Sequence, residues 1–286
     1  MPPKQQLTFV GFMLTVVFLS AGLLRTVVAD PIVRPKETSD HAAAPQTAND
    51  HAATSCDPNK FKIAIDVGHT IEAPGAISAR GVTEYVFNLR LAKQIDANLR
   101  DAGFVHTYLM ITRGVGSLQL KQRPARANAM GGVDLFISIH HDDVQPVYYS
   151  KWDYNGKTYH FSDKFAGYSI FVSYENRSKS ESLDFAELLA AELMARGMHF
   201  TAHHSEDIPG EHRQFLDPQR GIYRYDQLIV LKNTNTPAVL LEAGVIVNRA
   251  EEAILAQRHG LISAAVLEAT NQFCSLIQSK RTPQNQ

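Results

Sequence analysis

The chain has 286 residues, of which 44% are hydrophobic and 20% are charged, values that are ordinary for a globular protein. The formal net charge is −1, and it falls to −3 when residues 1–29 are removed together with their two basic side chains, Lys4 and Arg25. Nothing in this charge balance suggests nucleic acid as a partner, because binding to nucleic acid calls for a basic face. Once the two ends are set aside, the remaining length fits one domain.

The first 29 residues have the pattern of a signal peptide. An apolar run from Leu7 to Leu24 follows the basic Lys4, and the small residues 27–29 offer a cleavage site. We therefore expect export, removal of residues 1–29 and no stable membrane span afterwards. The apolar run is also long enough for a retained anchor, in which case the rest of the chain is still exported.

Residues 30–58 are polar, contain several prolines and show no apolar period, so we expect a flexible linker. The chain has two cysteines, Cys56 and Cys274. In an oxidising compartment such a pair can form a disulfide, and two unlinked thiols fit equally well because sequence does not give their separation in space. Two cysteines cannot build a cysteine-rich zinc site, so any metal must rely on histidines and carboxylates.

From residue 59 to about 280, strand patterns alternate with helix patterns. The expected strands are 62–66, 104–111, 133–139, 168–173 and 238–241. Of the expected helices, the first is capped by Thr83 and stops at Gly103, the next two are 118–130 and 182–196, and the last ends near Ile277. Alternation of this kind predicts an α/β fold in a single domain, with a mostly parallel twisted sheet and helices on both faces, followed by a disordered tail at 281–286. Two polar and aromatic stretches, 143–166 and 197–224, fit the alternation poorly and predict functional loops or lids.

Four side chains that can bind metal or transfer protons lie where these elements begin or end. His69 and His140 each follow a strand, Glu242 ends the strand 238–241, and Glu84 begins the first helix. In an open α/β sheet, the carboxyl ends of the strands gather the active groups at one edge. Each residue alone has an ordinary explanation, such as a hydrogen-bonding histidine or a glutamate favoured by the helix dipole. Their common location is what predicts a site.

Two imidazoles and one carboxylate are a usual ligand set for catalytic zinc, which keeps a fourth position for water. Zinc lowers the pKa of that water and a nearby glutamate can accept its proton, a combination that hydrolyses amides. The sequence contains neither an HExxH motif nor a GxSxG motif, and neither cysteine lies at a strand end. These absences favour a zinc hydrolase over other classes of hydrolase.

Five blocks in chain order resemble the zinc-dependent N-acetylmuramoyl-L-alanine amidases. They are IAIDVGH at 63–69, GVTEYVFNLRLA at 81–92, RPARAN at 123–128, DLFISIHHD at 134–142 and PAVLLEAGVIVNRAEE at 237–252. This resemblance implies that His69, Glu84 and His140 bind Zn²⁺ and that Glu242 is the catalytic general base. The implied substrate is peptidoglycan, cut between N-acetylmuramic acid and the L-alanine of the stem peptide, in the periplasm or cell envelope.

Two other functions are compatible with the same sequence. One is a catalytically inert wall-binding or activator protein built on this fold, and the other is a zinc peptidase that cuts a different peptidoglycan amide. The complete set of four candidate residues favours an active enzyme over an inert protein. No tandem wall-binding repeat is visible, so targeting depends on the domain itself or on a protein partner such as an activator.

His141 departs from the family pattern, which commonly has a small residue at this position. On a strand its side chain should point away from that of His140, so we expect a structural role. Four further residues match family positions and are expected to hold the sheet edge and to orient the ligands: Asp66, Arg123, Asn128 and Asp142.

The two irregular stretches carry further candidates. The first contains the aromatic residues Tyr148, Tyr149, Trp152, Tyr154 and Tyr159, which fit either a glycan-contact rim or a small hairpin with its own core. The second contains His199, His203, His204, Glu206, Glu211 and His212. These histidines fit no metal-site spacing, so we expect solvated loop residues and keep a second metal site as the alternative. Because related division amidases carry a regulatory insertion in this interval, we also expect Glu206 or Glu211 to shield the metal at rest.

Overall fold

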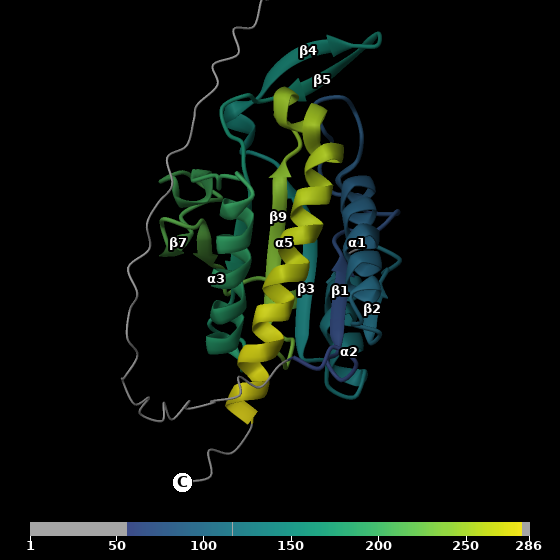
Figure 1. The fold of residues 1–286 in the computed structure, drawn as a ribbon. Coiled ribbons are helices and arrows are strands. Elements are labelled where there is room, and N and C mark those ends of the chain that lie inside the picture. Colours follow the sequence, from purple (N-terminus) through teal and green to yellow (C-terminus); the bar gives the residue numbers. More distant parts are fainter. Residues whose placement is uncertain (1–55, 116, 282–286) are drawn as a thin grey trace, which may run out of the picture. The chain divides into compact units, whose positions relative to one another are not determined.

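A computed structural model describes residues 56–115 and 117–281, so the predicted signal peptide, residues 30–55 of the linker and residues 282–286 of the tail lie outside the described residues. The described residues form a seven-stranded sheet in the order β2-β1-β3-β9-β6-β8-β7 (Figure 1). Its strands are β1 (Ile63–Val67), β2 (Thr107–Met110), β3 (Leu135–Asp142), β6 (Ser169–Val172), β7 (Gln214–Asp217), β8 (Ile222–Arg224) and β9 (Ala238–Val245). Strands β2, β1, β3 and β9 are parallel, whereas β6 pairs antiparallel with β9 and β7 antiparallel with β8. The predicted mostly parallel sheet is confirmed.

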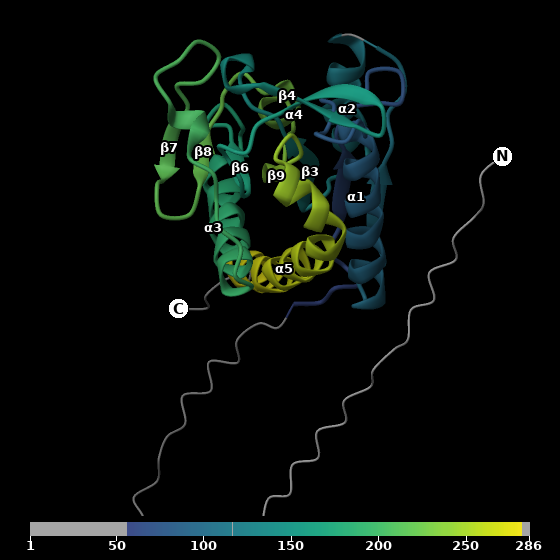
Figure 2. The same cartoon turned by 90° about the horizontal axis from the view of Figure 1, so that it is seen from above.

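Helices cover both faces of this sheet, as predicted. They are α1 (Glu84–Asp101), α2 (Ser117–Ala129), α3 (Lys179–Ala195), α4 (Ile229–Lys232) and α5 (Arg249–Arg281). Helices α1, α3 and α5 lie on one face, and α2 and α4 lie on the other (Figure 2). Alternate side chains of each strand serve the two cores: Ile137 and Ile139 of β3 pack toward α1 and α5, while Phe136 packs with Leu240 toward α4. Burial on both faces explains why these strands are continuous apolar runs.

Helix α1 begins at Glu84 for a reason other than the predicted one. Thr83 holds the N-cap position, but its side chain makes no capping hydrogen bond. The free amides of the first turn are satisfied instead by backbone carbonyls of the preceding loop: Glu84 N–H donates to Ala76 and Tyr85 N–H to Pro74. The loop and the first turn of the helix are therefore joined, and this junction positions Glu84.

The two irregular stretches differ in structure. The first contains the predicted small hairpin, β4 (Ser150–Tyr154) paired with β5 (Lys157–Phe161). On it Trp152 stacks on Tyr154 and donates from Nε1 to the carbonyl of Ala79, 2.7 Å away. The second stretch contains β7 and β8, which extend the main sheet and were not predicted, because three- and four-residue strands are too short to show a clear period.

Helix α5 ties the end of the domain to its beginning. Cys56 and Cys274 form a disulfide, so residues 56–58, the last of the predicted linker, are joined to this helix. Among the described helices α5 alone is long and apolar enough to cross a membrane, but half of its most apolar window is buried within the domain. Burial of that kind is typical of a core helix.

Candidate active site

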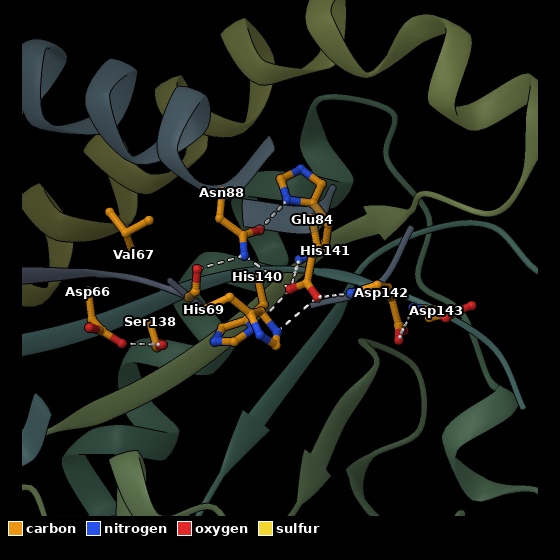
Figure 3. Close-up of polar contacts among 12 residues, drawn as sticks. Asp66, Val67, His69, Glu84, Asn88, Ser138, His140, His141, Asp142 and Asp143 are labelled. Carbon is orange, nitrogen blue, oxygen red and sulfur yellow. Dashed lines mark hydrogen bonds and ion pairs between the residues drawn. The ribbon is translucent and has the colours of Figure 1, made fainter. Parts of the chain in front are cut away.

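Three of the predicted site residues come together at the carboxyl end of the parallel strands. His69 follows β1, Glu84 is the first residue of α1 and His140 lies near the end of β3 (Figure 3). The Nε2 atom of His69 is 2.8 Å from one carboxylate oxygen of Glu84, and the Nδ1 atom of His140 is 3.1 Å from the other. The donor atoms of the three residues all lie within 4.8 Å of one another.

Two glycines provide the space in which these side chains converge. A Cβ atom on Gly68 would lie 2.5 Å from Nε2 of His140, and one on Gly75 would lie 2.3 Å from a carboxylate oxygen of Glu84. Gly75 also has a φ of +78°, which favours glycine. His69 itself has a φ of 64°, a left-handed conformation that is uncommon for residues with a side chain. The backbone is thus shaped around the three side chains.

The carboxyl group of Glu84 is held in its ionised form, which favours binding of a cation by Glu84, His69 and His140. Burial disfavours an ionised Glu84, but hydrogen bonds from His140 and His69 outweigh it and hold the pKa of this carboxyl well below its usual range. The Glu84 side chain is only 5% exposed, whereas His69 and His140 are 33% and 17% exposed. An ionised carboxylate at the base and two reachable imidazoles are the donor set that zinc prefers.

A hydrogen-bond chain on the helix side holds this group in place. Asn88, one turn after Glu84, donates from Nδ2 to the carboxylate of Glu84 (3.0 Å) and to the carbonyl of Gly68 (3.2 Å). The Oδ1 atom of Asn88 lies 2.8 Å from Nδ1 of His141. His141 therefore points to the opposite face of the sheet from His140, as predicted, and serves a structural role there (Figure 3). Sequence reasoning did not single out Asn88, although it stands one helical turn from a candidate ligand.

A buried ion pair fixes the loop that carries His69. The guanidinium of Arg123 in α2 pairs with Asp66 at 2.9 Å and donates to the carbonyls of Val67 and His69. Asp66 also accepts from Ser138 at 2.8 Å. These contacts are those of positioning residues, as predicted. Asn128 is half-buried and instead bonds the backbone of the 233–235 loop.

Glu242 lies beside the histidines and not among them. It pairs in register with His140 on the neighbouring strand, so both side chains lie on the same face of the sheet. One carboxylate oxygen of Glu242 is buried without a hydrogen-bond partner among the described residues. Burial, together with the nearby carboxylates of Asp142 and Glu84, raises the pKa of Glu242 well above its usual range. A carboxyl group with a strongly shifted pKa beside candidate metal ligands is typical of a catalytic site.

A cavity of about 170 Å³ borders the group on this same face. His69, His140 and Arg123 line it, together with apolar residues of α4 and β9, among them Ile229 and Leu240. Ligand sites commonly combine an apolar wall with a few polar groups. A bound molecule in this cavity reaches both imidazoles.

The stretch 197–224 departs from two predictions. His203 and His204 were expected to be solvated, but both are buried, because the loop folds back over the end of β3 and places them against Asp142. Either Glu206 or Glu211 was expected to shield the metal site. Glu206 instead bonds Tyr148 at 2.8 Å, and Glu211 pairs with His204 at 3.1 Å.

Comparison with known proteins agrees with this geometry. A family model described as N-acetylmuramoyl-L-alanine amidase matches residues 63–272. No curated protein is significantly similar to the chain.

Solved structures of amidases share the fold. Ami1 of Mycobacterium smegmatis is 18% identical with a TM-score of 0.58, over 77% of this chain and 99% of that one. CwlV of Bacillus (Paenibacillus) polymyxa var. colistinus is 24% identical with a TM-score of 0.53, over 74% and 97%. CwlD of Clostridioides difficile, solved in complex with the GerS lipoprotein, is 19% identical with a TM-score of 0.54, over 76% and 99%. Because the family match extends over more than half of the sequence and the fold agrees with it, the chain belongs to the N-acetylmuramoyl-L-alanine amidases, a family of enzymes that act on peptidoglycan.

Proposed function

We propose that this enzyme hydrolyses the amide bond between the lactyl group of N-acetylmuramic acid and the L-alanine of the stem peptide. His69, Glu84 and His140 bind a zinc ion in this proposal, and Glu242 is the general base. The observation that carries it is the convergence of two imidazoles on an ionised carboxylate, beside a glutamate of which one buried carboxylate oxygen has no hydrogen-bond partner in the described part of the chain. Zinc dependence is typical of the family to which the chain belongs.

A zinc ion at this position supplies a Lewis acid that polarises the scissile carbonyl and acidifies water. The other requirements fall on the chain itself. Asn88 and the Arg123–Asp66 pair keep Glu84 and the backbone at His69 in place, so that the ligands do not have to reorganise during the reaction.

Glu242 moves the proton. Its carboxylate accepts a proton from the attacking water as the oxygen of that water bonds the carbonyl carbon, and it then donates this proton to the alanine nitrogen as the carbon–nitrogen bond breaks. The raised pKa of Glu242 supports the second transfer, because a weaker acid holds its proton until the amine leaves. A cation beside Glu242 favours the ionised form that the first transfer needs.

The test is digestion of purified sacculi, with and without a chelator, by the wild-type enzyme and by Glu242→Gln. We expect wild-type digestion to release intact stem peptides with a free N-terminal L-alanine and to stop with the chelator. Glu242→Gln should lose at least about a hundredfold in turnover and still bind zinc by elemental analysis.

Glu268→Gln, the same change at an exposed position of α5, is the matched control and should retain full activity. Parental activity in Glu242→Gln contradicts the assigned base. Release of cut peptide cross-links identifies a zinc peptidase, and the absence of any product from the zinc-loaded enzyme contradicts an enzyme that acts without an activator.

We further propose that the enzyme works in the cell envelope after export, where its peptidoglycan substrate lies, and that a protein activator assists it. The signal-like residues 1–29 and the complex in which CwlD was solved support these two points. Fractionation of cells into cytoplasmic and envelope extracts tests the location, and a cytoplasmic enzyme with residues 1–29 retained contradicts it.

A further inference from the structure

A second group of metal-binding side chains lies buried beyond the end of β3. Asp142 ends that strand, and His203 and His204 come from the short 3₁₀ helix at 203–205. The Oδ2 atom of Asp142 is 2.8 Å from Nε2 of His204 and 3.4 Å from Nε2 of His203. The donor atoms of these three residues lie within 4.8 Å of one another, and all three residues are buried. None of them belongs to the site proposed for catalysis.

Only one of the two ring nitrogens of His203 has a hydrogen-bond partner among the described residues. Its Nδ1 atom lies 2.8 Å from the hydroxyl of Thr201, which holds the ring in place. Its Nε2 atom has no hydrogen-bond partner among the described residues, although the side chain is only 1% exposed. A buried imidazole nitrogen without a partner is costly, and here it is directed at a carboxylate oxygen. A metal ion between them satisfies both atoms.

The other two side chains are held in the same manner. His204 places Nδ1 3.1 Å from Glu211, and Gln145 donates to the other oxygen of Glu211 at 2.7 Å. Asp142 accepts a backbone hydrogen bond from Asp143 at Oδ1, which leaves Oδ2 facing the two histidines. Metal-binding histidines commonly have their second nitrogen bonded to a carboxylate, and Glu211 occupies that position for His204.

We propose that Asp142, His203 and His204 form a second metal site, which binds a zinc ion. Ligand atoms of a tetrahedral zinc site lie roughly 3.3 Å apart, given metal–ligand distances of about 2.0–2.1 Å. The 3.4 Å between Asp142 and His203 has this spacing, and the 2.8 Å between Asp142 and His204 equals the shortest ligand spacing in the first group. The site joins β3 to the 197–224 stretch, so its role is to hold that stretch against the sheet. It does not depend on the proposed reaction.

The competing interpretation is a metal-free network. Burial disfavours a charged His204, but Asp142 and Glu211 raise the pKa of this imidazole to about 9, so a proton can take the place of a metal between His204 and Asp142. That network leaves Nε2 of His203 without a partner, whereas the metal site uses it. The two interpretations predict different metal contents.

The test counts zinc by elemental analysis after the protein is stripped with a chelator, reloaded with Zn²⁺ and freed of excess metal. We expect about two zinc ions per chain in the wild type and about one each in His203→Gln and His140→Gln, with none in the double variant. His199→Gln, a change at an exposed histidine of the same stretch, is the control and should keep two.

One zinc ion in the wild type and none in His140→Gln overturns the second site, and this comparison holds even if His203→Gln fails to fold. A different result is possible, in which the wild type binds one ion, His140→Gln keeps it and His203→Gln loses it. That result supports the second site and contradicts the proposed catalytic one. Two ions in His203→Gln overturn the ligand assignment. These readouts need no measurement of activity.

Discussion

His259 makes the stability of the domain depend on pH, and the size of the effect follows from its surroundings. The side chain is buried in α5, with Nε2 3.2 Å from Nε2 of His141 and with no hydrogen-bond partner for Nδ1 among the described residues. Burial, together with the charge of Arg90, lowers the pKa of His259 from 6.5 to about 4. The unfolded chain therefore binds a proton below pH 6.5, whereas the native protein binds it only near pH 4. Stability contributed by this residue is complete above pH 6.5 and is lost as the pH falls toward 4.

The full difference of about 2.5 pKa units corresponds to roughly 3 kcal/mol, and about 2 kcal/mol of it is lost between pH 7 and pH 5. The assay is urea unfolding followed by circular dichroism at the two pH values, in a chelator so that metal release does not contribute. His259→Gln should lose about 2 kcal/mol less than the wild type over this interval. His106→Gln, at an exposed histidine, is the control and should behave as the wild type does. An equal loss in His259→Gln and the wild type refutes the reasoning.

Three further predictions concern the candidate site and the disulfide. Gly75→Ala should lower zinc affinity at least about tenfold in a competition assay with a chelating dye, because the added Cβ atom meets the carboxylate of Glu84. The control is Gly131→Ala, which has a similar positive φ but no atom within 4 Å of the added Cβ, and which should keep the wild-type affinity. Equal affinities in the two variants contradict the role given to Gly75. Asn88→Ala should lower zinc affinity roughly 10–100-fold in the same assay, since Glu84 loses a hydrogen bond, and unchanged affinity contradicts its positioning role. Cys56→Ser should reduce the free energy of unfolding by about 2–5 kcal/mol, because the disulfide joins residues 218 positions apart, and reductant should destabilise the wild type but not the variant.

Much of the fold follows from local sequence patterns. The strands β1, β3 and β9 are continuous apolar runs because they are buried on both faces, and α1 shows an apolar residue every four positions because one of its faces packs on the sheet. The placement of His69, His140 and Glu242 follows from the same patterns, since parallel strands end at one edge. The role of Asn88 does not follow from them, because its partners come from three separate segments.

What the sequence by itself determined is therefore the order of the elements, the edge at which the candidate ligands gather and, through resemblance, the family. Only the tertiary structure decided that Cys56 pairs with Cys274, that two short strands extend the sheet, and that His203 and His204 lie buried against Asp142. The reason is physical. Burial of a helix or strand follows from its own period, whereas the burial of a loop side chain depends on where the loop folds back, and His204 meets a partner 62 residues earlier in the chain.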